Sequence, residues 1–166
     1  MNIGAVRQYL NMFMQAVSEN TTGAEIVETE DGPVLYCSVK SPFETERDIG
    51  YQISMLPYDD SIFAVEIIMF LFTDIGKDKY QDMNRLINTL NNYIVFGSFR
   101  LFEEGSVLFC QGMMLDETMQ TAKVNEHIVK TLSVMENTAV NAGEYILRLL
   151  NGENINAIMD DIGKEG

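Results

Sequence analysis

The stretch that decides the fold is Asp82–Leu115, which reads DMNRLINTLNNYIVFGSFRLFEEGSVLFCQGMML. Its first part carries apolar residues at helical spacing, which predicts an amphipathic helix over residues 79–95. The apolar stripe consists of Met83, Leu86, Ile87, Leu90 and Ile94. Gly97 breaks this pattern, and two strand-like runs follow within residues 98–114, joined at Glu103-Glu104-Gly105. The stretch therefore predicts a helix followed by a β-hairpin.

One helix and four strands are expected before this stretch. Apolar residues at helical spacing predict a helix over residues 2–19, and Asp31-Gly32 predicts a tight hairpin turn. The expected strands cover residues 24–29, 34–39, 49–55 and 62–72. The run Ile62–Phe72 is apolar at every position but Glu66, which is typical of a central strand covered on both faces. A helix of that length is the competing interpretation, and the β-branched and aromatic content favours the strand.

A long helix is expected after the hairpin, from about Glu117 to Leu150, with Asp116 as its N-cap. Asn151-Gly152 is a typical C-terminal stop. The acidic tail 153–166 has apolar residues spaced as in one further short helix. The predicted order of the domain is α-β-β-β-β-α-β-β-α, an α+β fold in which helices pack on an antiparallel sheet. We expect a single domain over residues 1–152, followed by the tail.

Charge limits the classes of partner. The 166 residues include 11 Lys and Arg against 25 Asp and Glu, a net charge of -14. This balance argues against binding nucleic acid, which needs clustered cations, and equally against anionic membrane surfaces. It favours a protein or peptide partner that is basic. The alternative interpretation is that acidity only keeps the protein soluble.

The two cysteines, Cys37 and Cys110, lie within apolar strand patterns and are far apart in the sequence. They are typical of buried thiols in a reducing compartment. No apolar run approaches the ~20 residues that a membrane-spanning helix needs. We therefore expect a cytoplasmic protein.

Catalytic and metal chemistry lacks a sequence signature in this chain. His127 is the one histidine, and its neighbours Asn125, Glu126 and Lys130 indicate an exposed helix position. Two cysteines and one histidine offer no zinc-ligand spacing, and the glycine-rich and nucleophile motifs of common enzyme families are absent. The sequence therefore predicts no catalytic residue, no cofactor and no metal site.

Three residues are candidates for facing a partner: Glu66, Met113 and Met114. Glu66 interrupts an apolar strand, and a buried carboxylate would have a raised pKa of the kind found at functional sites. The alternative is that it points to solvent or pairs with Arg85 or Arg100. The methionines belong to a set of eleven, which could line an adaptable binding groove or simply fill the core.

The segment Leu86 to Val107 resembles the YbjN-like family, in which a helix ends in a Leu-Asn-x-x-Asn-like stretch before a hairpin with an acidic or glycine turn. Leu90-Asn91-Asn92 matches this stretch in part, because the second asparagine is not at the family's spacing. The resemblance implies the related fold of type III secretion chaperones. It also implies a small, acidic homodimer that binds segments of other proteins, and it carries over no functional residue.

The leading hypothesis is a non-enzymatic protein-interaction module, chaperone-like or regulatory, that binds a peptide or protein segment. One alternative is a small-molecule binder or enzyme with a cavity under the helices, where Glu66, Tyr51 and His127 would be the first groups to inspect. Another is a structural subunit whose long helix and tail mediate assembly. We expect the asparagines of Asp82–Leu115 to lie on a solvated face, and any functional surface to lie outside that stretch.

Overall fold

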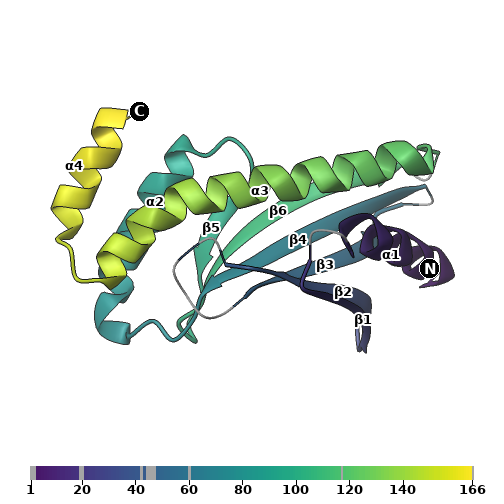
Figure 1. Cartoon of the computed structure of the whole chain (residues 1–166), viewed down its shortest axis with the longest axis horizontal. Coiled ribbons are helices and arrows are strands. Elements are labelled where there is room, and N and C mark those ends of the chain that lie inside the picture. Colours follow the sequence, from purple (N-terminus) through teal and green to yellow (C-terminus); the bar gives the residue numbers. More distant parts are fainter. Residues whose placement is uncertain are drawn as a thin grey trace. The chain divides into compact units, whose positions relative to one another are not determined.

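A computed structural model describes residues 3–18, 21–41, 43, 48–59, 61–116 and 118–165. Figure 1 shows the elements of these residues along the chain. In chain order they are α1 (Ile3–Val17), β1 (Gly23–Thr29), β2 (Gly32–Val39), β3 (Ile49–Pro57), β4 (Ile62–Phe72), the 3-10 turn η2 (Lys77–Lys79), α2 (Tyr80–Tyr93), β5 (Ser98–Leu101), β6 (Val107–Asp116), α3 (Thr121–Leu150) and α4 (Ile155–Glu165).

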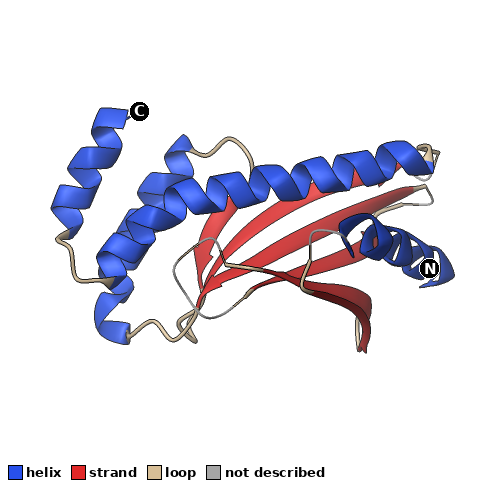
Figure 2. Cartoon of the chain, viewed as in Figure 1, coloured by secondary structure: helices blue, strands red, loops and turns tan. Residues whose placement is uncertain are grey.

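The strands form one six-stranded sheet in the order β1-β2-β3-β4-β6-β5, so β1 and β5 lie at its edges (Figure 2). The pairs β1–β2, β2–β3 and β5–β6 are antiparallel. Gly32 has the positive φ of +122° that a tight hairpin turn needs, which confirms the turn expected at Asp31-Gly32. The expectation of an α+β protein with an antiparallel sheet is confirmed.

The chain divides into two compact units. One consists of residues 1–69 and 111–134, and the other of residues 70–110 and 135–166. We call them the sheet unit and the helix unit. Because β4, β6 and α3 contribute residues to both, neither unit is one continuous stretch of sequence. The single domain expected over residues 1–152 stays a prediction.

The core of the sheet unit lies between α1 and the sheet. The expected apolar stripe of α1 is buried, as are alternate residues of β3. These side chains are Val6, Leu10, Phe13 and Val17 of the helix and Ile49, Tyr51, Ile53 and Met55 of the strand. Helix α1 packs against β1, β2 and β3, and the Tyr9 ring centroid lies 5.6 Å from that of Phe63 in β4. Every second residue of β3 is buried over most of its length, which confirms the prediction of a half-buried strand.

Strand β4 has the expected bounds, but the expectation that both faces are covered is wrong. Its buried residues alternate through Phe63, Val65, Ile67 and Met69, while Glu66 between them is exposed. The apolar residues of the other face are only partly covered, except Phe72 at the end of the strand, which is buried. An apolar run shows that both faces tolerate burial, but it does not show which face a helix covers.

The start of α3 also differs from the expectation. The helix begins at Thr121, and Asp116 is the last residue of β6 rather than an N-cap. The Asp116 carboxylate accepts hydrogen bonds from the Thr118 N–H and hydroxyl, each 2.8 Å long, which makes a turn between strand and helix. These bonds lower the pKa of Asp116. Glu117, the expected first helical residue, lies outside the described residues.

The helix unit contains the end of β4, η2, α2, β5, the first part of β6, the C-terminal part of α3 and α4. Helix α3 ends where Gly152, at φ +91°, donates to the Leu149 carbonyl and Glu153 donates to the Arg148 carbonyl. This pair of bonds is the Schellman arrangement, which stops a helix at a glycine. The tail then forms α4, which packs against α2 (Figure 1).

Candidate functional site

The candidate site is built around the loop that joins α2 to β5, and Asn91 holds that loop in place. The Asn91 side-chain amide donates to the Phe99 carbonyl (3.0 Å), and its oxygen accepts the Phe99 N–H (2.8 Å). Phe99 lies in the edge strand β5, so Asn91 pairs with backbone groups that a further strand would otherwise use. The helix and the strand are therefore tied together, and residues 94–97 must turn within a short span.

Gly97 makes this turn and allows no side chain. Its φ of +80° is a conformation that other residues rarely adopt. A Cβ atom at Gly97 would lie 2.7 Å from Cζ of Phe109 and 2.8 Å from the Cys110 carbonyl oxygen. The loop is thus fixed at one end by Asn91 and at the other by close packing on β6.

The fixed loop exposes large apolar side chains. Tyr93, Val95 and Phe96 are 55%, 86% and 63% exposed. Single exposed apolar residues are ordinary on protein surfaces, but a cluster held on a rigid loop is typical of an interaction site. We call these three residues the apolar rim.

A groove of about 800 Å³ lies beside the apolar rim, within the helix unit. One wall comes from the end of α2 and the following loop, the other from α3, and one residue comes from α4. The lining consists of Leu90, Tyr93, Ile94, Val95, Phe96, Thr138, Asn141, Ala142, Glu144, Tyr145, Arg148 and Ile162. The groove combines an apolar wall with a wall of mixed polarity, which is common in sites that bind peptides or small molecules.

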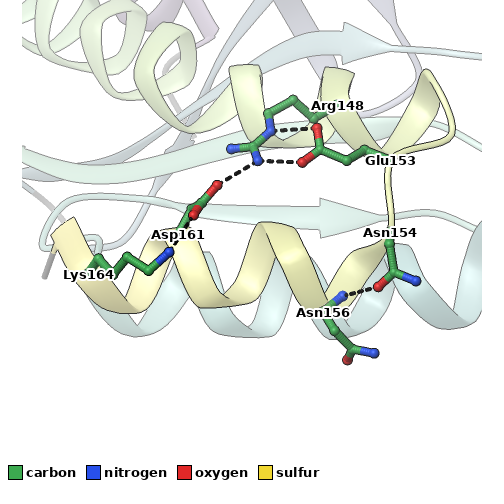
Figure 3. Close-up of polar contacts among 6 residues, drawn as sticks. All are labelled: Arg148, Glu153, Asn154, Asn156, Asp161 and Lys164. Carbon is green, nitrogen blue, oxygen red and sulfur yellow. Dashed lines mark hydrogen bonds and ion pairs between the residues drawn. The ribbon is translucent and has the colours of Figure 1, made fainter.

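Arg148 lines the groove, but its charge is already paired (Figure 3). Its Nε donates to Glu153 (2.8 Å) and an Nη donates to Asp161 (2.8 Å), while Lys164 also donates to Asp161 (3.0 Å). Hydrogen bonds from Arg148 hold the pKa of Glu153 and of Asp161 below their ordinary values, and they raise the pKa of Arg148. The Arg148 guanidinium also lies 5.5 Å from the centre of the Tyr145 ring.

Glu144 is the other charged residue of the groove. Its side chain is exposed, and no ion pair to it is present among the described residues. Because Arg148 is neutralised by its two carboxylate partners, Glu144 leaves a negative charge on the α3 wall. The groove therefore offers apolar contact and one available carboxylate.

The three residues predicted to face a partner belong to the sheet unit, and none of them lines this groove. Glu66 is exposed, Met114 is 50% exposed, and Met113 is partly buried. Glu66 alternates with the buried Val65 and Ile67 of β4, and Met114 lies between the partly buried Met113 and the buried Leu115 of β6. The exposure of Glu66 excludes a buried carboxylate at this position, and its partner-facing role stays a prediction.

The residues named for a cavity-based enzyme differ in their exposure to solvent. Tyr51 is buried in β3, whereas His127 and Glu66 are exposed. Within the described ranges, no group of three or more His, Cys, Asp or Glu side chains is arranged to hold a metal ion. Cys37 and Cys110 are both buried, which confirms their expected placement in the core.

Sequence reasoning missed the apolar rim because it assigned Ile94 to the helix stripe and Asn91 to a solvated face. The helix ends at Tyr93 instead, and Asn91 bonds to the backbone of β5. A signal was present: Tyr93-Ile94-Val95-Phe96 is apolar without a break and precedes a glycine. Such a run does not continue an amphipathic stripe, because it would place apolar residues all round a helix.

No helix in the described part of the chain is long and apolar enough to span a membrane. No protein-family model matches the chain, and no curated protein matches its sequence. The resemblance to the YbjN-like family therefore stays a prediction.

Proposed function

We propose that this protein is a non-enzymatic interaction module that binds an apolar and basic segment of another protein in the groove beside the apolar rim. The observation that carries the proposal is the exposure of Tyr93, Val95 and Phe96 on a loop that Asn91 and Gly97 hold rigid. A rigid rim loses little conformational freedom on binding, and this lowers the cost of association.

The size of the apolar contribution indicates a modest affinity. Covering Val95 and Phe96 would contribute about 3 kcal/mol, since full burial of one such side chain is worth roughly 1.5–3 kcal/mol. Association costs at least about 4 kcal/mol in lost freedom, so the rim alone does not produce binding. The partner must bring apolar side chains of its own, which enter the groove between α2 and α3.

Charge selects which apolar segments bind. The chain carries a net charge of -14, and Glu144 stands on the groove wall. A basic residue in the partner is attracted by the net charge of the chain and by Glu144, whereas an acidic segment is repelled by them. We therefore propose a basic partner, and no role in nucleic-acid binding.

The resemblance supplies the finer parts of the proposal: a chaperone-like fold, a homodimer and a cytoplasmic location. Two buried thiols support a reducing compartment. Light scattering tests the dimer directly, with an expected mass twice that of one chain. The mass of a single chain would remove the homodimer from the proposal.

A small-molecule ligand is the second candidate, because a volume of about 800 Å³ is within the range of ligand pockets. Such ligands usually lose most of their surface to the protein, and walls as exposed as Val95 and Phe96 cannot enclose them. The exposure of these walls therefore favours a protein segment. The third candidate, a structural subunit assembled through α3 and the tail, has no comparable supporting feature, since α4 packs on α2 of its own chain.

Defined peptides test the proposal by calorimetry with the full chain. The probes are peptides of about 14 residues made only of leucine and lysine, and matched peptides of leucine and glutamate. A helix of this number of residues is ~21 Å long. We expect a leucine–lysine peptide to bind and Phe96→Ser to weaken it at least about tenfold. The control Met114→Ser changes a half-exposed apolar residue of the sheet unit and should leave the affinity unchanged. The proposal is wrong if no leucine–lysine peptide binds, or if Met114→Ser has the larger effect.

A further inference from the structure

We infer that the groove is a vacant helix position, so that the segment it binds is an amphipathic α-helix rather than an extended strand. This inference rests on the proposed function and specifies its partner. Three features of the helix unit support it: the spacing of residues along α3, the way α4 already packs, and the closed edge of β5.

The first feature is a second stripe on α3, beside the one that enters the core. The core stripe includes Ala139, Ile146 and Leu149, all buried. Thr138, Asn141, Tyr145 and Arg148 form the neighbouring stripe, and these four residues line the groove. They stand at helical spacing over about 15 Å, which is the length of roughly three turns of a facing helix.

The second feature is α4, which shows how this unit accepts a helix. Ile155, Ile158 and Ile162 stand at i, i+3 and i+7 and are all buried, and α4 packs against α2. One charged anchor, Asp161 on Arg148, completes the docking. Ile162 also forms part of the groove lining, so a partner helix would contact α4 as a neighbour. An apolar stripe with one charged anchor is the general pattern of helix-in-groove recognition.

The third feature argues against an added strand. A strand that extends a sheet gains its affinity from backbone hydrogen bonds along a free edge. At the β5 edge, the Phe99 N–H and carbonyl are already bonded to Asn91. The groove walls are formed largely by helices, whose backbone groups bond within the helix, so an extended peptide would find few backbone partners there.

The chemistry of the partner follows from these walls. Apolar side chains at i, i+3 or i+4, and i+7 would contact the apolar rim and the groove floor. A lysine or arginine on the flank of the same helix would reach Glu144, the carboxylate that lacks an ion-pair partner among the described residues. This partner resembles α4 in its apolar pattern and carries the opposite charge at its anchor.

The test uses two peptides of identical composition, each of leucine and lysine. In one, the leucines recur at helical period, and in the other they alternate with lysine as in a strand. Calorimetry with the full chain measures both affinities, and circular dichroism measures helix formation on binding. We expect the helical peptide to bind at least about tenfold more tightly than the alternating one and to gain helix content.

Matched charge variants locate the binding surface. Glu144→Gln and Glu66→Gln each remove one exposed carboxylate, so the net charge changes equally. We expect Glu144→Gln to weaken the binding of the helical peptide about threefold to tenfold, because one charge-assisted contact is lost. Glu66→Gln should have only the small effect that follows from the lower net charge of the chain.

The outcomes separate this inference from the proposed function. Equal binding of both peptides through Phe96 would overturn the helix inference while the proposed function stands. Binding of neither peptide would overturn both. If light scattering shows a dimer that Phe96→Ser dissociates, the occupant of the groove is a second copy of this chain, and the inference of a foreign basic helix is wrong.

Discussion

The open side of the sheet and the loop after α2 both expose apolar side chains, but they do so for different reasons. Over residues 111–116 of β6, alternation directs every second residue away from the core, and Met114 is half exposed for that reason. On the loop, Val95 and Phe96 are exposed because Asn91 and Gly97 fix a turn that leaves them no cover. The first exposure follows from regular strand geometry, whereas the second requires specific residues to maintain it.

The difference indicates where a binding function resides. A methionine on an exposed sheet face can be replaced by a polar residue with little loss of stability, so its exposure does not indicate a binding function. A loop held by a side-chain amide and a glycine without space for a Cβ atom depends on both residues. Substitutions at these two residues should therefore cost far more stability than substitutions at exposed positions nearby.

Gly97→Ala is expected to have the largest effect on stability. The methyl group would meet the Phe109 ring and the Cys110 carbonyl, at a backbone angle that alanine disfavours. We expect the free energy of unfolding to fall by about 3 kcal/mol, measured by urea denaturation. The control is Gly112→Ala in β6, where the methyl group has open space. It should change stability by less than about 1 kcal/mol. Equal effects of the two substitutions would mean that the loop is not specially constrained.

Asn91→Ala is expected to have the next largest effect. It leaves the Phe99 N–H and carbonyl without their partner in a partly buried position, which costs about 2 kcal/mol. Amide hydrogen exchange at Phe99 should become faster as well. The matched variant Asn88→Ala, at an exposed position of the same helix, should stay within about 0.5 kcal/mol of the native chain. An unchanged exchange rate at Phe99 would contradict the role given to Asn91.

Arg148→Gln should loosen α4 without unfolding the rest of the chain. The substitution removes the ion pairs to Glu153 and Asp161, while the buried isoleucines of α4 remain. We expect faster hydrogen exchange at Ile158 and Ile162 and little change at α1. Lys130→Gln removes an exposed pair with Glu126 on α3 and is the control, with no expected effect on α4. The role of Arg148 is wrong if both variants leave α4 exchange unchanged.

Lowering the pH should also loosen α4, but by less than the Arg148→Gln substitution does. The pKa values of Glu153 and Asp161 are lowered in the folded chain by hydrogen bonds from Arg148. Their contribution to α4 docking is therefore complete above the ordinary carboxyl pKa and is lost as the pH falls through the lowered pKa values. Hydrogen exchange of α4 measured against pH should show this step in the native chain. In Arg148→Gln the step should move up toward the ordinary pKa values and shrink.

Much of the fold could be predicted because burial in α1, β3 and α2 follows simple periods of hydrophobicity. Val6, Leu10 and Phe13 recur every three or four residues, and Ile49, Tyr51 and Ile53 every two, as the buried residues of the structure do. The coverage of β4 could not be predicted in this way. Its run is apolar on both faces, so the sequence contains no period that distinguishes them.

The candidate site was less accessible to prediction, for a physical reason. The residues that create the apolar rim are an asparagine and a glycine, and their roles depend on Phe99 and Phe109, which follow later in the chain. The local pattern of apolar residues extends the stripe of α2 to Ile94, one residue beyond the end of the helix. It therefore predicts no exposed loop directly after Tyr93. Glu66, by contrast, stood out in the sequence because it interrupts an apolar run, and the structure shows that it is exposed.

The most direct test of the binding site is chemical-shift mapping of the full, isotope-labelled chain with the helical leucine–lysine peptide. The account predicts saturable shifts at Val95 and Phe96 and along the groove stripe of α3, at Asn141 and Tyr145. The resonances of Glu66 and Met114 should stay unchanged through the titration. Saturable shifts centred on Glu66 and Met114, with the loop after α2 unaffected, would contradict the account and return the binding surface to the sheet.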